Sequence, residues 1–266
     1  MSSLSTIAKD VAAVDAPVDM LVDYLLRLGD DSLILAQRLT ELCGHAAALE
    51  VDLSLANIGL DLIGQATLFL ELAGKIEGKG RDGDKLAFHR DVLAFRNCLL
   101  VEQPNGDFAQ TMARQFLFST WQQLFLDRLA HSSEPRIAEI AAKAVKEVRY
   151  HAEISADWVI RLGDGTEESR HRMVEGLEWC WRFVDELFEM DAIEARLVEA
   201  GIAVDRGLLR GDFDRTIAAV LTEATIALPV YPRGISGGRV GHHSEHLGHL
   251  LAPMQYLART YPDAVW

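Results

Sequence analysis

Apolar residues recur at helical spacing along almost the whole chain, and no segment shows the sustained alternation of a strand. The pattern predicts long helices separated by short turns, over about 18–42, 49–74, 85–101, 107–130, 135–163, 166–200, 212–228 and 244–260. Long helices joined in series are typical of an all-α bundle. We therefore expect a single helical domain over residues 19–266, preceded by a flexible N-terminal extension over residues 1–18.

Residues that begin or end helices stand at several of these boundaries. Gly44 follows the first predicted helix, and Asp107, Thr166 and Ser244 come at the start of three others. A glycine beyond the last turn ends a helix readily, while short polar side chains accept hydrogen bonds from the first free backbone N–H groups. The sequence therefore predicts that helices begin directly after these three polar residues.

The segment 53–73, LSLANIGLDLIGQATLFLELA, is almost entirely apolar or small. Asn57, Asp61 and Gln65 interrupt it at steps of four, and we expect them to form one polar ladder on a helix face. A helix that is apolar on nearly all sides is expected to be buried, and buried polar groups need hydrogen-bond partners. The ladder is therefore predicted to face polar groups on neighbouring helices, to face a ligand or metal, or to be the remnant of such a site.

Charge and composition restrict the kinds of partner. The 266 residues include 40 Asp and Glu against 26 Lys and Arg, a net charge of −14. This balance argues against nucleic acid and against an anionic membrane surface, because both attract basic proteins. Three separated cysteines without a C-x-x-C motif, Cys43, Cys98 and Cys180, indicate a reducing compartment. No signal peptide is apparent, and Asp61 interrupts the longest apolar run, so we expect a cytoplasmic protein without membrane segments.

Large helical bundles with buried polar residues commonly hold two metal ions, and the sequence can be tested for the ligands. Such a site takes a Glu from each of two helices and a Glu-x-x-His from each of two others. Residues 108–126 contain no Asp or Glu, and Asn57 and Leu60 stand where a Glu-x-x-His would be sought. The Glu-x-x-His that the chain does contain, Glu168 to His171, lies in a charged helix start and is expected to be a solvated face.

Glu147 and His151 lie four residues apart on the predicted helix over 135–163. At this spacing they share a helix face and could bind a metal. We favour a buried hydrogen-bonded pair near Lys143 or Tyr150, because one carboxylate cannot balance two metal ions. The chain is accordingly predicted to hold no catalytic, cofactor-binding or metal-ligating residue.

His242, Glu245 and His246 spell H-x-x-E-H, and His249 is expected on the same helix face as the other two histidines. This is the zinc motif of one metalloprotease class. Glycines precede it directly, however, where that class has an established helix. We favour a structural cap or an interface here, with adventitious metal binding as the next alternative and a metalloprotease as a minor one.

The loop YPRGISGGRVG, residues 231–241, is the longest segment of flexible composition between predicted helices. Its glycines could offer backbone N–H groups to an anion, and Arg233 and Arg239 would add positive charge. No Walker-type Lys followed by Ser or Thr comes after it. We therefore favour a mobile connector over an anion site.

One family resembles this chain in several long segments. The C subunits of the multicomponent ring 1,2-phenylacetyl-CoA epoxidases are similar to it in LRLGDDSLILAQRLTELCGHAAALEVDLSLANIGLDLIGQA, LLVEQPNGDFAQTMARQF, AAKAVKEVRYHAEISADWVIRLGDGTEES and HSEHLGHLLAPMQYL. The similarity extends over about residues 24–266 and leaves residues 1–20 as an extension. The resemblance implies a ferritin-like fold and a role in bacterial phenylacetate catabolism.

The resemblance also implies a division of labour between subunits. A sister subunit of the same fold carries the di-iron site and binds phenylacetyl-CoA, and the C subunit is its non-catalytic structural partner. A reductase with a flavin and an iron–sulfur centre supplies electrons from NADPH. Against the sister's pattern, Val148 and His151 fall on the second Glu-x-x-His, so one histidine remains and both motif glutamates are absent.

Together these observations predict a structural subunit that holds no cofactor and contacts the di-iron subunit, the other subunits and the reductase, with homo-oligomers also possible. Two alternatives remain open: a self-sufficient ferritin-like metal oxidase, and a homodimer that binds an acyl-CoA through residues 234–241. The mean hydropathy of +0.07 fits a chain with an extensive interface. We expect part of that interface on the Trp121 helix, at Gln115, Gln122 and Gln123.

Overall fold

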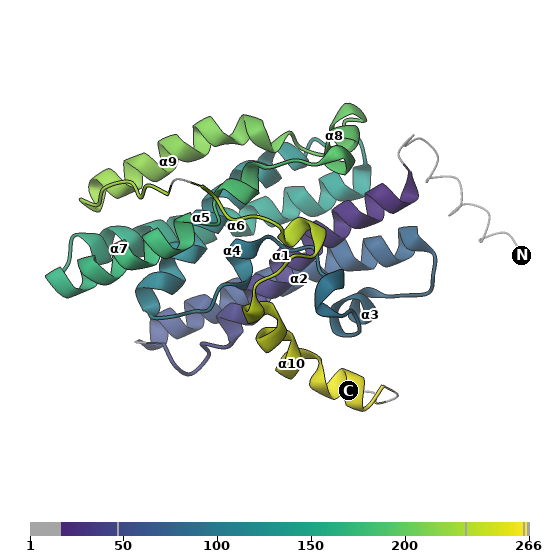
Figure 1. The fold of residues 1–266 in the computed structure, drawn as a ribbon, viewed down its shortest axis with the longest axis horizontal. Helices are drawn as coiled ribbons and strands as arrows, with labels where there is room; N and C mark the ends of the chain where they lie inside the picture. Colours follow the sequence, from purple (N-terminus) through teal and green to yellow (C-terminus); the bar gives the residue numbers. More distant parts are fainter. Residues whose placement is uncertain (1–16, 47, 232, 263, 265–266) are drawn as a thin grey trace, which may run out of the picture.

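The computed structural model describes residues 17–46, 48–231, 233–262 and 264, and every regular element in them is helical. α1 packs along α2 and α5 along α6, and the two pairs lie side by side (Figure 1). The predicted all-α bundle of long helices is confirmed. Residues 1–16 of the predicted N-terminal extension lie outside the described residues. The four long helices are α1 (Val18–Thr40), α2 (Leu49–Glu77), α5 (Phe108–Leu129) and α6 (Pro135–Gly163).

Additional short helices surround this bundle (Figure 1). α7 and α9 pack against α5 and α6, α8 packs against α1, and α10 packs against α1, α3 and α4. The short segments are α3 (Gly83–Phe88), η1 (Val92–Ala94), α4 (Leu99–Glu102), α7 (Glu167–Trp181), η2 (Asp185–Phe188), α8 (Ala192–Glu199), η3 (Arg206–Leu209), α9 (Arg210–Glu223), η4 (Gly238–Val240) and α10 (Glu245–Thr260).

The helix starts predicted from polar residues are confirmed. The Asp107 carboxylate accepts a hydrogen bond from the backbone N–H three residues on, at 2.9 Å. Thr166 and Ser169 form a reciprocal capping box at the start of α7. Ser244 precedes α10 as predicted, but its side chain makes no capping bond, and its backbone N–H donates to Glu102 instead.

The prediction of a single helix over 85–101 is wrong, because side chains of α1 accept hydrogen bonds from the backbone of this segment. The Asp30 carboxylate accepts a hydrogen bond from the Arg96 N–H, and the Asp31 carboxylate accepts one from the Cys98 N–H, both at 2.8 Å. Arg90 also forms an ion pair with Asp30. The N–H groups of residues 96 and 98 therefore bond to α1 rather than to carbonyls four residues earlier, and the chain runs extended into α4.

Two later helix boundaries also differ from the prediction. The helix predicted over 166–200 ends at Trp181, and α8 then starts afresh, because Asp191 caps it by accepting from the Glu194 N–H at 3.0 Å. The helix predicted over 212–228 corresponds to α9, which ends at Glu223. Thr225 then adopts a left-handed conformation with φ of 56°, and its carbonyl accepts a hydrogen bond from the Arg170 guanidinium.

The interface expected on the Trp121 helix is also wrong. α5 lies at the centre of the bundle, covered by α6, α7 and α9. Trp121 is 1% exposed, and Gln115 and Gln122 are buried with it, while Gln123 is half-buried. The Gln115 and Gln122 amides instead donate hydrogen bonds inside the chain, to the Ser119 hydroxyl and to the Gln65 side chain.

Candidate functional site

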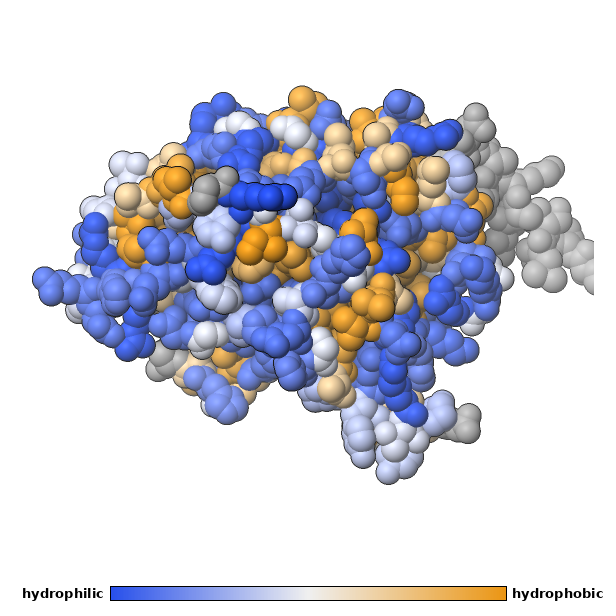
Figure 2. All heavy atoms as spheres, viewed as in Figure 1, coloured by the Kyte–Doolittle hydropathy of each residue, from blue (hydrophilic) through white to orange (hydrophobic). Residues whose placement is uncertain are grey.

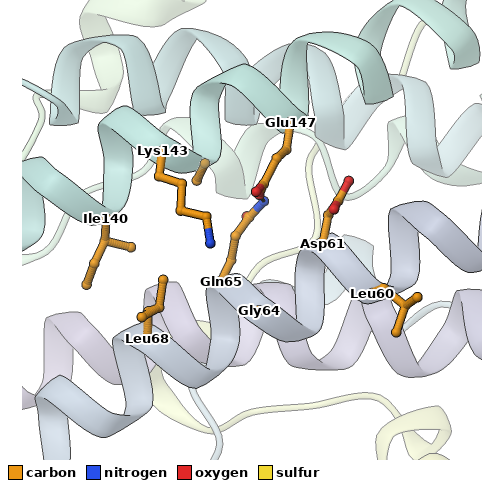
Figure 3. A pocket seen from close by; sticks show the side chains of 9 residues that line it. Leu60, Asp61, Gly64, Gln65, Leu68, Ile140, Lys143 and Glu147 are labelled. Atoms are coloured by element: carbon orange, nitrogen blue, oxygen red, sulfur yellow. Dashed lines mark hydrogen bonds between the residues drawn. The ribbon is translucent and has the colours of Figure 1, made fainter.

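Polar residues of α2 and α6 meet along a seam, by which we mean the hydrogen bonds that join the two helices. Figure 3 shows three members of the seam, Asp61, Gln65 and Glu147. The Asp61 carboxylate lies 3.0 Å from Nε2 of His151, and the Gln65 amide donates to Glu147 at 3.3 Å. The side-chain amide of Gln122 on α5 donates to the side-chain oxygen Oε1 of Gln65 at 3.2 Å, which extends the seam into the core. Two of the three predicted ladder residues therefore do face polar groups on neighbouring helices.

Asn57 does not share that environment, and here the prediction of one buried ladder is corrected. Asn57 is exposed, Asp61 is half-buried, and Gln65 is 2% exposed. A step of four residues turns 400° on a helix of 3.6 residues per turn, so each step moves the side chain about 40° around the axis. The ladder therefore turns from solvent into the core over two steps. α2 itself is buried on one side only.

His151 is the most enclosed member of the seam, with no exposed surface. Burial lowers the pKa of His151 below its ordinary value, and the hydrogen bond and charge of Asp61 oppose that shift only in part. The imidazole is therefore neutral at pH 7. With the Asp61 carboxylate as acceptor, the proton sits on Nε2.

The seam does not fit a di-metal centre. No group of three or more His, Cys, Asp and Glu side chains in the described part of the chain is placed to hold a metal ion. α5 presents Gln115 and Gln122 inward where a carboxylate would be needed. Neutral amides cannot balance the charge of two cations, but they can satisfy their neighbours without a metal.

The assignment of Asn57 and Leu60 to the Glu-x-x-His positions also fails on geometry. Leu60 is 64% exposed and points away from α6 (Figure 3). Asp61 and Gln65 are the residues of α2 that bond to α6, and the hollow beside them is also lined by Gly64, Leu68 and the edge of Leu60. On α6 the assigned positions do face inward, since Val148 and His151 are both fully buried.

Glu147 and His151 are hydrogen-bonded as predicted, but to α2 rather than to each other. Lys143 lines a hollow beside Glu147, between α2 and α6. The Tyr150 hydroxyl lies 3.1 Å from the Ser54 hydroxyl. The other candidate pair on a helix, Glu168 and His171, is a solvated face as predicted. Both side chains are about two-thirds exposed, and each pairs with a residue four positions further on.

The glycine loop is held by the chain's own carboxylates. Glu186 accepts hydrogen bonds from the N–H groups of Gly237 and Gly238, at 3.0 and 2.8 Å. Arg239 is 8% exposed and pairs with Asp31 at 2.7 Å. The loop therefore cradles an anion, as its glycines suggested, but that anion is the Glu186 side chain. The favoured interpretation of residues 231–241 as a mobile connector is therefore wrong for residues 237–239.

The histidine cluster does not form a metal-binding face. α10 begins at Glu245, so His242 lies outside the helix and cannot share a helix face with His246 and His249. The sequence interpretation passed over His243, whose side chain is 1% exposed and lies 2.8 Å from the Glu102 carboxylate through Nδ1. Its Nε2 lies 3.0 Å from the Phe95 carbonyl oxygen. No local pattern marks His243, because both partners come from more than 140 positions away.

His243 should make stability depend on pH. Both ring nitrogens face acceptors, so the imidazolium fits best. Burial alone would lower the pKa of His243, but Glu102 and the Phe95 carbonyl outweigh it and raise that pKa. A raised folded-state pKa means that the stabilisation is complete below the unfolded pKa of about 6.5 and is lost as pH rises through the folded value. We expect His243→Gln to lower the free energy of unfolding by about 2 kcal/mol at pH 5.5.

The measurement is the melting temperature of wild type and His243→Gln from pH 5.5 to 9. The gap between them should narrow as pH rises. His171→Gln, at an exposed histidine, is the matched control and should show no such trend. A gap that is constant or widens with pH would contradict the imidazolium.

α2 is the one helix of the described residues that is long and apolar enough, by length and composition, to cross a membrane. In its most apolar window 44% of the residues are buried inside the fold. The seam with α6 accounts for part of this burial, and core helices of the same composition are common.

Comparison with known proteins shows the family. The model of the family described as Phenylacetic acid catabolic protein matches residues 3–266, starting earlier than the resemblance suggested. A curated relative, the C subunit of the 1,2-phenylacetyl-CoA epoxidase of Escherichia coli (strain K12), is 49% identical over 249 residues. Those residues cover 94% of this chain and 100% of the relative. The chain therefore belongs to the phenylacetic acid catabolic protein family.

Proposed function

We propose that this chain is the non-catalytic subunit of a cytoplasmic phenylacetyl-CoA epoxidase complex, in which it pairs with a ferritin-like subunit that holds the di-iron centre. The observation that carries the proposal is the composition of the α2–α6 seam. It contains Asp61, Glu147 and His151, closed by the amides of Gln65 and Gln122, where a di-iron site would need four carboxylates. The 49% identity to the C subunit of an epoxidase supports the same role.

In this role the chain contributes surface and rigidity rather than a reacting group. Hydrogen bonds join Asp61 to His151, Gln65 to Glu147 and Gln122 to Gln65, so these helices are held together without a metal, although Nδ1 of His151 and the amide oxygen of Gln122 are buried without a partner. The iron would belong to the partner, and electrons would reach that partner from a reductase. Within the described ranges no group of three or more His, Cys, Asp or Glu side chains is placed to hold a metal ion, which argues against a self-sufficient metal oxidase. Acyl-CoA binding at Gly237 and Gly238 would have to displace Glu186.

The test is co-expression with the catalytic subunit, followed by co-purification, activity and metal analysis. We expect a complex of fixed stoichiometry, a catalytic subunit that is inactive or poorly soluble alone, and far less than one iron per chain when this chain is purified alone. Tightly held, near-stoichiometric iron that is lost in His151→Ala but kept in His171→Ala would overturn the proposal. So would a catalytic subunit that is fully active without this chain.

A further inference from the structure

α2 carries a stripe of large apolar side chains that nothing in the described structure covers. Together these residues expose roughly several hundred Å² of largely apolar surface, which is comparable to the largest patch on a typical monomer and to about half of one side of a standard interface. The stripe consists of Leu49 (70% exposed), Leu53 (56%), Leu60 (64%), Ile63 (40%) and Leu68 (39%).

Beyond its first turn, where Glu50 and Asp52 stand beside Leu49, α2 is almost free of charge. Asp61 is the single charged residue between positions 53 and 70, and the first Lys or Arg of α2 is Lys75. The neighbouring α6 is different, since Lys143, Lys146 and Arg149 are all exposed. Figure 2 gives a comparison with another part of the surface. On the face that it shows, apolar side chains lie in groups between hydrophilic ones. Depletion of charge marks the core of a protein–protein interface.

A furrow runs beside the stripe, along the junction of α2 and α6. It consists of three hollows along the junction. From the α2 N-terminus onward, their volumes are about 380, 110 and 180 Å³. The second and third share Leu68 and Ile140, which face each other across the junction (Figure 3). The lining is mixed, since Asp61, Lys143 and Glu147 stand beside Leu60, Leu68 and Ile140 in the middle hollow. An elongated furrow between two helices with an apolar stripe along one edge is a shape that can receive an amphipathic helix.

Gly64 gives independent support, because the fold of this chain does not require it. A Cβ at Gly64 would meet no atom within 4 Å, and the residue lies in the middle of a regular helix. Glycine there weakens the helix relative to alanine. It stands one turn from Leu60 and one turn from Leu68, at the edge of the furrow. A glycine at such a place lets another backbone approach closely.

We propose that the stripe and the furrow of α2 and α6 are the docking face for a helix of the catalytic subunit, with Gly64 at the closest approach. This inference rests on the proposed function and adds the surface. A second copy of this chain fits less well, because two-fold contact would bring together two chains of net charge −14 and two sets of Asp61 and Glu147. The partner helix should instead present a basic side chain to these carboxylates.

The test compares Leu60→Glu and Gly64→Leu with Leu208→Glu in the full-length chain. Leu208 is also 64% exposed but lies on η3. Each variant is titrated against the purified catalytic subunit. We expect the dissociation constant to rise at least tenfold for the two α2 variants and to stay unchanged for Leu208→Glu. The melting temperature of isolated Gly64→Leu should be equal to or above that of wild type, because leucine favours the helix.

The outcomes separate this inference from the proposed function. If wild type does not bind the catalytic subunit, both are contradicted. Wild type that binds, with both α2 variants binding equally well, overturns the docking face alone. Two results would overturn the proposed occupant: a wild-type homodimer that Leu60→Glu dissociates in sedimentation, or binding to phosphatidylcholine vesicles that Leu60→Glu abolishes.

Discussion

Replacing Glu186 by alanine should lower the free energy of unfolding by about 3–5 kcal/mol and the melting temperature by roughly 10 °C. Glu186 is 1% exposed, and its carboxylate accepts hydrogen bonds from the N–H groups of Gly237, Gly238 and Leu99. Burial raises the pKa of Glu186, while Arg239 and these N–H groups counteract the rise. Removal of the carboxylate leaves three backbone donors without their acceptor, and two of them, the N–H groups of Leu99 and Gly238, are buried.

The position of the glycine loop depends on this carboxylate. Gly238 lies so close to the Asn97 carbonyl oxygen that a Cβ there would approach it within 2.2 Å. The loop can therefore reach Glu186 only with glycine at this position. Thermal denaturation of Glu186→Ala, compared with Glu189→Ala at an exposed glutamate nearby, measures the effect. Equal melting temperatures for the two variants would show that the loop is held in some other way.

The second large effect is expected at Glu194, which compensates two buried arginines. Glu194 and Arg206 form an ion pair in which neither side chain is more than 2% exposed, and Arg27 lies 3.5 Å from the same carboxylate. Burial lowers the pKa of Arg206, and the charge of Glu194 opposes this. Glu194→Leu leaves Arg206 charged and unpaired beside the rings of Trp121 and Phe125. We expect Glu194→Leu to lower the free energy of unfolding by about 3–5 kcal/mol.

A double variant tests whether the unpaired charge of Arg206 causes the destabilisation. Glu194→Leu with Arg206→Leu removes both charges, and Arg27 keeps Asp23 and Asp191 as partners. Apolar replacement of a whole buried pair is often neutral or stabilising. The double variant should therefore unfold at a higher temperature than Glu194→Leu alone. Glu199→Leu, at an exposed glutamate of α8, is the control. A double variant less stable than the single one would contradict the charge argument.

The helices that the sequence predicted well are those whose boundaries depend on near neighbours. Asp107 and Thr166 act on backbone groups three residues away, so their capping role can be read locally. The segment 85–101 could not be predicted in this way. Its backbone bonds to Asp30 and Asp31, more than 60 positions earlier, and its own composition is compatible with a helix.

The candidate site likewise combines features that the sequence shows directly with contacts between distant residues that it does not show. The absence of Asp and Glu from residues 108–126 was evident from the sequence, and it remains the strongest argument against a di-metal centre. The pairing of Asp61 with His151 and of Gln65 with Glu147 was not evident, because these contacts join positions 90 and 82 residues apart. His243 was missed for the same reason.

By itself the sequence determined the helical class, most of the long helices, the capped starts of α5 and α7, and the shortage of carboxylates, because helical periodicity and capping are interactions between residues a few positions apart. The tertiary structure alone decided which faces those helices bury. It turned Asn57 and Leu60 outward and Gln65 inward, filled the glycine loop with Glu186, and left the apolar stripe of α2 uncovered. Which face of an apolar helix is buried depends on where its neighbours pack, and those neighbours are distant in the chain.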